Sequence, residues 1–334
     1  MKKYNGNFKA AITLPKSWWN RLIPALKFLI GSALIIFLFV SGQLNLADVL
    51  SSYRNLPALI AGVVCCTLAF IIPIFRWWII ARIQKLPVSG FEAFRLTMIG
   101  YFFNTFIPGS SGGDIIRAVY AVRACPERKA HALTVAFADR GLGLHAVLLL
   151  SVAAFFIKPS LFNNAPHLKP WLMLIPGMLI AGIVIPFFLV WERTNGFFVR
   201  LFGKIVGGAD AWREALRLYR QQSGMVCLAY LCSIGNVVFN VLTIHFMMQS
   251  VGSTPDLIES LMIAPLVILA NALPITPGGI GIAEAASAGL YTIVGQTGGA
   301  NAMLLTRLII IIHSMVGFPF FLQGKRHRTV ESTY

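Results

Sequence analysis

Apolar stretches of bilayer-spanning length dominate this sequence and limit what it can fold into. A helix crosses the hydrocarbon core with about 20 apolar residues. Stretches of that kind occupy residues 22–40, 57–80, 133–157, 171–191, 225–248 and 303–322. Charged residues make up 12% of the chain, against about 25% in soluble domains. The sequence therefore predicts an all-α, polytopic helical membrane protein with about six full crossings and both termini on one side.

The first apolar stretch superficially resembles a signal peptide, because basic residues precede it. It is too long and too far from the start for one, and it lacks an obvious small-residue cleavage site. We interpret it as a first transmembrane helix. The expected domains are a basic cytoplasmic tail at residues 1–21, an integral membrane domain at residues 22–322 and a cytoplasmic tail at residues 323–334.

Two longer apolar segments, residues 91–122 and 257–294, are each broken by proline and glycine. Loops rich in lysine and arginine stay on the cytoplasmic side, and the predicted outer loops hold only Arg54, Lys158 and Lys169. This asymmetry requires the first segment to enter from the cytoplasm and return to it, and the second to do the same from outside. We expect two opposed re-entrant hairpins in a bacterial inner membrane, with both termini cytoplasmic.

The two breaks have similar sequences, NTFIPGSSGGD at residues 104–114 and NALPITPGGIGIAE at residues 271–284. Each has an asparagine, then Pro-Gly, then further glycine and an acidic residue. Opposed hairpins with matching sequences are typical of an inverted-topology repeat. Between the halves, residues 197–222 alternate apolar and basic side chains at helical spacing, with a break at Gly207 and Gly208. This pattern predicts an interfacial amphipathic segment that anchors the chain to the inner leaflet.

Each break predicts a polar cavity, because non-helical backbone at membrane depth is tolerated only inside protein or beside water. The helix that follows the first break would direct its free N–H groups toward a bound anion. The structural alternative is a tight turn at Pro108 and Gly109, with Ser111 capping the next helix and Asp114 complementing its dipole. The motif alone supports both interpretations equally.

Ionisable residues within the apolar segments strengthen the functional interpretation. Asp114 and Arg117 share one helix face, and a cation near the bilayer centre costs about 2.5 to 3.5 kcal/mol. Asp139 and Arg140 are sequence neighbours and cannot face each other on a helix, so each is expected to reach another helix. A network that only fixes helix packing is the alternative. Once Arg76 and Arg95 are included, arginines outnumber acids locally, and this favours an anionic headgroup as occupant.

Other classes of function lack their sequence signatures. No GxSxG, P-loop or dinucleotide motif occurs, and the five cysteines and six histidines form no metal-binding pattern. We therefore expect no catalytic activity, no metal and no cofactor. The lysines and arginines that give the net charge of +16 lie between apolar segments and not on one face of a soluble domain. This distribution disfavours a nucleic-acid-binding function. Proton coupling through Asp114, Asp139 or Glu284 stays open.

Three motifs in order give the chain a specific resemblance. They are FRLTMIGYFFNTFIPGSSGGDIIRAVYAVR at residues 94–123, ADRGLGL at residues 138–144 and PITPGGIGIAEA at residues 274–285. The chain resembles the lysylphosphatidylglycerol synthase transmembrane-region family, also called the flippase-like domain family. Members fused to a cytosolic aminoacyl-transferase move the aminoacylated phospholipid to the outer leaflet. Because this chain ends at Tyr334 without that domain, we expect a stand-alone member without synthase activity.

The residues and the resemblance together give the expected site. Many members of the family carry Glu where this chain has Asp139, so the charge is kept and the reach is shorter. The residues expected to bind the headgroup are Asn104, Ser110, Ser111, Gly112, Gly113, Asp114, Arg117, Asp139, Arg140, Glu284 and Arg307. The expected hinge residues are Pro108, Gly109, Pro277, Gly278, Gly279 and Gly281.

The predicted function is translocation of a lipid with an anionic or aminoacylated phospholipid headgroup, or of a polyprenyl-phosphate-linked lipid. The expected partners are such membrane lipids. One alternative is a non-transporting membrane partner or regulator of a lipid-modifying or glycosyl-transferring enzyme. Another is an integral transferase that uses a lipid-linked donor. The sequence leaves the lipid, the direction, the energy source and the oligomeric state open.

Overall fold

The computed structural model describes residues 51–106, 112–124, 128–157, 209–273 and 275–322, with short pieces at 29, 32–33, 35–37, 39–42, 45, 176–177, 179–180 and 182. Across these residues the regular structure is helical, which confirms the predicted all-α membrane fold. Four described helices are long and apolar enough to cross a membrane: Leu56–Ile83, Lys129–Ala153, Ser223–Ser250 and Gly299–Leu322. They match four of the predicted crossings.

The other two predicted crossings, residues 22–40 and 171–191, lie largely outside the described residues, so the count of six stays a prediction. The two terminal tails and residues 197–208 of the amphipathic segment lie outside them as well. The described elements, in chain order, are η1 (Ser51–Asn55), α3 (Leu56–Ile83), α4 (Gly90–Phe106), α5 (Gly112–Ala124), α6 (Lys129–Ile157), α9 (Ala209–Gln221), α10 (Ser223–Ser250), α11 (Leu257–Ala272), η5 (Pro277–Gly279), α12 (Ile282–Thr292) and α13 (Gly299–Met315).

Local sequence signals explain where these helices begin. The Asn55 side chain accepts a hydrogen bond from the Ala58 N–H and caps α3, which has proline in its first turn. Asp256 and Glu259 form a reciprocal capping box at the start of α11. Each device satisfies backbone N–H groups that the helix itself leaves without partners.

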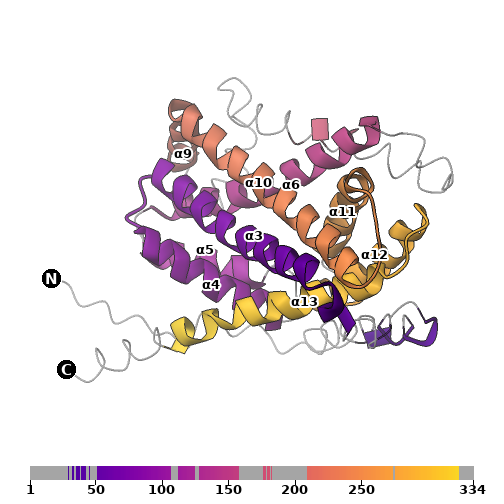
Figure 1. Cartoon of the computed structure of the whole chain (residues 1–334). Helices are drawn as coiled ribbons and strands as arrows, with labels where there is room; N and C mark the ends of the chain where they lie inside the picture. Colours follow the sequence, from indigo (N-terminus) through magenta and orange to yellow (C-terminus); the bar gives the residue numbers. More distant parts are fainter. Residues whose placement is uncertain are drawn as a thin grey trace.

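Helices α3 and α10 lie side by side and run in opposite directions through the centre of the fold (Figure 1). Asn55, next to the start of α3, donates to the Gln249 carbonyl near the end of α10, at 3.1 Å. Halfway along, the Asn236 side chain of α10 donates to the Ala69 carbonyl of α3, at 2.7 Å. The two halves of the chain are thus joined by their long antiparallel helices.

The same order of elements occurs twice around this central pair. A long helix, a shorter one, a break, another short helix and a final helix appear first as α3, α4, α5 and α6, and again as α10, α11, α12 and α13. In each half the short helices pack together across the break, and the final helix packs on the second of them. Between the halves, α6 packs on α11 and α13 packs on α4. The order and the reciprocal packing are those expected of the inverted repeat.

The second break leaves helical geometry, as predicted. Gly278, Gly279 and Gly281 have φ angles of 59°, 71° and 82°, a region that favours glycine over residues with a Cβ. The first break, residues 107–111, lies outside the described residues, and with it Pro108 and Gly109. The predicted hinge motion at both breaks stays a prediction.

Helix α9 has the predicted amphipathic character. Its Ala215 and Leu218 are buried, whereas Arg213, Arg217 and Arg220 are exposed. The Gln84 side chain, just beyond the end of α3, donates to the Ala215 carbonyl at 2.9 Å. Helix α9 therefore packs one face on the bundle near the end of α3 and presents its basic face outward.

Candidate functional site

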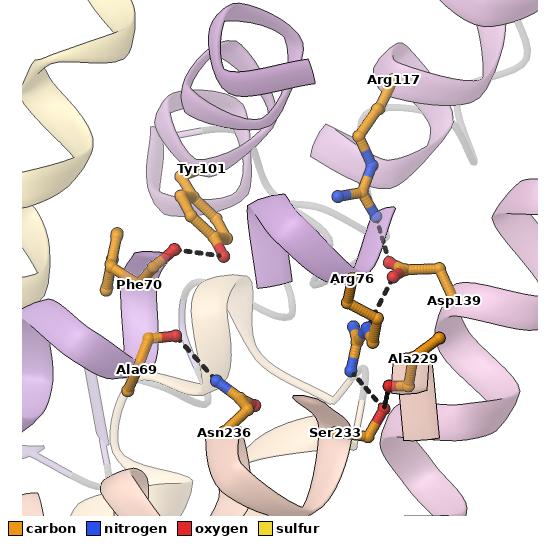
Figure 2. A network of polar contacts seen from close by, with 9 residues as sticks. All are labelled: Ala69, Phe70, Arg76, Tyr101, Arg117, Asp139, Ala229, Ser233 and Asn236. Carbon is orange, nitrogen blue, oxygen red and sulfur yellow. Dashed lines mark hydrogen bonds and ion pairs between the residues drawn. The ribbon is translucent and has the colours of Figure 1, made fainter. Parts of the chain in front are cut away.

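A buried carboxylate holds two arginines from different helices together. Asp139 of α6 is 2% exposed. Its Oδ1 accepts from Nε of Arg76 on α3 at 2.7 Å, and its Oδ2 accepts from Nη2 of Arg117 on α5 at 2.5 Å. Figure 2 shows the carboxylate between the two guanidinium groups. We call Arg76, Arg117 and Asp139 the Asp139 centre.

Neighbouring side chains fix Arg76 in this place. Its Nη1 donates to the Ser233 hydroxyl of α10 at 3.2 Å, and that hydroxyl donates to the Ala229 carbonyl at 3.1 Å (Figure 2). Gly143, one turn beyond Asp139 on α6, makes room for the guanidinium, since a Cβ at this glycine would lie 3.1 Å from Arg76 Nη1. Arg76 thus connects α3, α6 and α10.

Arg117 is held by both charge and an aromatic face. Its guanidinium carbon lies 5.6 Å from the ring centroid of Trp77 on α3, within range of a cation–π interaction. Helix α5 reaches this position because it packs backbone to backbone on α4 where Gly100 and Gly113 meet, with no space for a Cβ at Gly113. The start of α5 is tied down by the Asn104 side chain, which accepts from the Gly113 N–H at 2.7 Å.

The Asp139 centre holds two guanidinium groups and one carboxylate. Arginine stays protonated in proteins, and Asp139 accepts from two arginines, so the three side chains carry a net charge of +1. Arg76 is 8% and Arg117 is 6% exposed. Buried guanidinium groups are stabilised by anionic and hydrogen-bonding partners, and here two of them share one carboxylate.

The matching part of the second half has a different ion pair. Glu284 of α12 is fully buried and pairs through Oε1 with Nε of Arg307 on α13. The Glu284 Oε2 also accepts from Arg307 Nη2 at 3.2 Å and from the Gly281 N–H at 2.8 Å. Arg307 donates further to the carbonyls of Gly278 at 2.9 Å and Gly279 at 3.1 Å. This Glu284 centre, made of Glu284 and Arg307, is balanced in charge and holds the second break.

The two breaks meet at Asn104. Its side chain caps α5 after the first break, and its carbonyl oxygen would lie 3.6 Å from a Cβ at Gly278 in the second break. Asn271 holds the corresponding place at the end of α11 and lies against Gly279, where its Oδ1 leaves no space for a Cβ. The end of each hairpin's first helix thus contacts a glycine of the segment that returns.

The structure separates the predicted headgroup residues into groups. Arg117 and Asp139 meet in the Asp139 centre, and Asn104 and Gly113 lie at the first break beside α5. Glu284 and Arg307 form the second centre together with the hinge residues Gly278, Gly279 and Gly281. Arg140, although adjacent to Asp139 in sequence, is exposed on α6. Gly112 begins α5; Ser110, Ser111 and the side chains of Asp114 and Pro277 lie outside what the structure describes.

Sequence reasoning noticed Arg76 as a nearby cation but did not assign it to the site. Its signal was present, because it is a lone charge in an otherwise apolar stretch of α3. Ser233, Trp77 and Gly143 were missed as well. Serine, tryptophan and glycine are common in membrane helices, so only their contacts with the two arginines distinguish them.

Comparisons with known proteins find similar membrane proteins. A UPF0104 membrane protein of Methanothermobacter thermautotrophicus is 21% identical over 74% of this chain and 80% of its own length. One from Pyrococcus horikoshii is 19% identical over 90% of this chain and 97% of its own. A third, from Methanocaldococcus jannaschii, is 22% identical over 78% and 84%. No solved structure matches the chain.

A family model described as the lysylphosphatidylglycerol synthase TM region matches residues 25–317. This range contains both breaks and both ionic centres. The chain is thus a multi-pass membrane protein that belongs to the family of the lysylphosphatidylglycerol synthase transmembrane region.

Proposed function

We propose that this protein moves lipids across the bilayer by binding an anionic headgroup at the Asp139 centre while the acyl chains stay in the membrane. The observation that carries the proposal is that two buried guanidinium groups, those of Arg76 and Arg117, converge from different helices on the carboxylate of Asp139. The planar guanidinium group is also well suited to pair with phosphate oxygens.

Asp139 has a positioning role in this proposal. Without an anion between them, two guanidinium groups in a low-dielectric interior repel each other. The Asp139 carboxylate keeps both arginines in place, close enough together to act on one headgroup. Trp77 adds a weaker attraction on the Arg117 side.

The inverted repeat supports movement of the headgroup between the two sides. In transporters with this architecture, one repeat moves against the other around a site near the membrane midplane. Here the two halves meet along α3 and α10, and their breaks meet at Asn104. The glycines of the second break, with positive φ angles, supply backbone that need not remain helical.

We also propose that the protein lies in a bacterial inner membrane with both termini in the cytoplasm. The distribution of basic and acidic residues between the two ends of the bundle supports this orientation. Arg82 near the end of α3, Arg128 before α6 and the basic face of α9 gather at one end of the bundle, where Arg128 Nη1 and Ala215 O both contact Gln84. The opposite end holds the acidic capping box of Asp256 and Glu259. Basic ends are retained inside.

We further propose that the protein moves the lipid without modifying it covalently.

The decisive experiment for lipid movement reconstitutes the purified chain in liposomes with acyl-labelled lipids: phosphatidylglycerol, its aminoacylated form and a polyprenyl phosphate. Leaflet exchange of at least one of them is expected for the wild type, with a loss of about tenfold or more in Arg117→Ala, because one headgroup charge pair is removed. Folded wild-type protein that exchanges none of these lipids contradicts the proposal and favours a role as partner of another enzyme.

A further inference from the structure

We infer that His313 is a proton-binding site at a contact between the two halves of the molecule, and that a proton bound there slows lipid movement. The effect on lipid movement rests on the proposed function, whereas the site itself does not. His313 belongs to α13 in the second half and meets Thr67 of α3 in the first half, with 2.9 Å between Nε2 and Oγ1. Both residues lie near the middle of helices long enough to cross the membrane.

The hydrogen bonds around His313 are all made only when its ring carries two N–H groups. Nδ1 lies 2.8 Å from the Ile309 carbonyl oxygen, which can only accept, so Nδ1 carries a proton. The Thr67 hydroxyl has one proton, and it donates to the Val63 carbonyl at 2.8 Å. Thr67 is then an acceptor for Nε2, which has a proton to donate in the imidazolium. In a neutral ring, Nε2 has no proton and competes with Val63 for that of Thr67.

The surroundings of His313 suit a cation held between the two halves. A cation at membrane depth is costly unless it has partners. The Phe70 ring centroid of α3 lies 5.2 Å from that of His313, within range of a cation–π interaction. Tyr101 of α4 packs on Phe70 and donates to its carbonyl at 3.3 Å. Gly317, one turn beyond His313, lies against the Met98 carbonyl of α4 with no space for a Cβ. At this place α13 therefore packs closely on α3 and α4.

Histidine is the group here whose charge ordinarily changes between about pH 5 and about pH 8. Helix α13 packs on α3, α4, α10 and α12, and α10 has no Asp, Glu, Lys or Arg. The charged residues of the other helices and of α13 are Arg76, Arg82, Glu92, Arg95, Glu284 and Arg307. Arg307 pairs with Glu284, and Arg76 pairs with Asp139.

The other titratable groups on these helices do not provide a charge at His313. Cys66, next to Thr67, is buried in an apolar cluster with Ile309, and Tyr101 packs on Phe70. Thiols and phenols are ordinarily uncharged at neutral pH. On α10, His245 forms a hydrogen bond with Ser260 of α11.

A second histidine at a comparable contact gives a matched control. His145 lies six residues after Asp139 on α6, as His313 lies six residues after Arg307 on α13. Its Nδ1 lies 2.7 Å from the Tyr230 hydroxyl of α10, so it too joins the final helix of one half to the first long helix of the other. Its Nε2 is buried and has no hydrogen-bond partner among the described residues. A second proton on this ring would give a buried cationic N–H without an acceptor, which is costly.

A proton on His313 strengthens the contact between the halves. A hydrogen bond donated by a charged group contributes more than a neutral one. As the pH rises, Nε2 gives its proton to water, and the Thr67 hydroxyl keeps its bond to Val63. The hydrogen bond from α13 to α3 is then lost. Movement of one repeat against the other breaks contacts of this kind, so lipid exchange is expected to be slow at acidic pH and faster once His313 is neutral.

The charge of the ring can be measured without reference to lipid movement. Solid-state NMR of the full chain in bilayers, with isotope-labelled histidine nitrogens, distinguishes an imidazolium from a neutral ring. His313→Phe and His145→Phe assign the two signals. His313 is expected to be an imidazolium at about pH 5 and neutral at about pH 8, whereas His145 stays neutral. Thr67→Val keeps the size of the side chain, removes the acceptor, and is expected to weaken the imidazolium signal of His313.

Leaflet exchange of acyl-labelled phosphatidylglycerol in liposomes tests the effect on movement, with the same pH on both sides. Its phosphate stays ionised throughout this range. The wild type is expected to exchange the lipid about tenfold faster at about pH 8 than at about pH 5, the factor for losing a hydrogen bond to a charged group. In Thr67→Val and His313→Phe this ratio is expected to fall toward one. In His145→Phe it is expected to be kept.

The two measurements separate the site from its effect. A His313 ring that is neutral at about pH 5 overturns the proton-binding site and leaves lipid translocation standing. An imidazolium at His313, with the wild-type ratio of exchange rates kept in both Thr67→Val and His313→Phe, overturns its effect on movement. A ratio that His145→Phe also abolishes overturns the assignment to His313. No exchange by folded wild-type protein contradicts the proposed function, and the NMR signal still decides whether His313 binds the proton.

Discussion

The Asp139 centre joins α3, α5 and α6 in the first half of the molecule, the Glu284 centre joins α12 and α13 in the second, and their charges are arranged differently. At Asp139 two arginines share one carboxylate; Arg76 also donates to a serine hydroxyl, and Arg117 lies near an aromatic ring. At Glu284 one arginine meets one carboxylate and also holds two glycine carbonyls of the break. The first centre thus has two guanidinium groups on one carboxylate, whereas the arginine of the second centre also binds the backbone of the break.

The largest effect expected from this difference is on stability at the Glu284 centre. Glu284→Gln leaves the Arg307 guanidinium without a counter-charge in a site where Glu284 is fully buried. Loss of one partner from a buried pair costs about 3 to 5 kcal/mol. Unfolding in mixed micelles at increasing denaturant measures this change.

A double variant controls for the isolated charge. Arg307→Met combined with Glu284→Gln removes the unpaired guanidinium and is expected to recover part of the lost stability. A single Glu284→Gln variant that unfolds like the wild type shows that this pair does not hold the second break.

The Asp139 centre is expected to respond to its ligand in a way that the Glu284 centre does not. Asp139→Asn removes the charge of the carboxylate that Arg76 and Arg117 share, and the loss of stability is expected to be about 3 kcal/mol. An anionic lipid can replace the missing charge. Phosphatidylglycerol is therefore expected to raise the melting temperature of Asp139→Asn more than that of Glu284→Gln, as measured by thermal unfolding in detergent with and without the lipid. Equal shifts in the two variants remove the distinction between the centres.

A smaller effect tests the packing around Arg76. In Gly143→Ala the new methyl group lies 3.1 Å from Arg76 Nη1 and forces the guanidinium to shift. The expected loss is about 1 to 3 kcal/mol, the range for overpacking, together with slower lipid exchange. Gly141→Ala on the same helix meets no atom within 4 Å and is expected to be neutral or to stabilise by up to about 1 kcal/mol. Thermal unfolding of both variants gives the comparison, and identical behaviour contradicts the tight fit at Gly143.

The smallest effect concerns the backbone of the second break. Gly278 has a φ angle of 59°, so Gly278→Ala is expected to cost about 1 kcal/mol. Its Cβ meets the Asn104 carbonyl at 3.6 Å, which is an ordinary contact. The cost is therefore conformational, and denaturant unfolding measures it. Gly289→Ala, with nothing within 4 Å in α12, is the control.

Much of the helical architecture was predictable because the bilayer imposes its own length scale. Residues 57–80 and 225–248 are apolar for long enough to cross, and they became α3 and α10 with ends shifted by only a few residues. The second Pro-Gly break leaves helical geometry between α11 and α12, as its sequence predicts. The alternation of arginine with apolar residues at helical spacing predicted an amphipathic helix, which is α9 in the structure.

The pairing of charges was not predictable from sequence. Arg76 and Asp139 are 63 residues apart and meet only because α3 and α6 pack beside each other. Arg140 follows Asp139 directly, and one residue on a helix turns the side chain by about 100°, so it lies on a different, exposed face. Sequence reasoning detected an excess of arginine but did not place it in one half of the repeat.

The most direct test of the difference between the two centres locates the bound headgroup. Phosphatidylglycerol with a photoreactive group on its glycerol can be cross-linked to the reconstituted protein, and the modified peptides identified by mass spectrometry. Modification of peptides from α3, α5 and α6 around Arg76, Arg117 and Asp139, reduced by Arg117→Ala, is the predicted result. Cross-links confined to η5, α12 and α13 around Glu284 and Arg307 contradict the account.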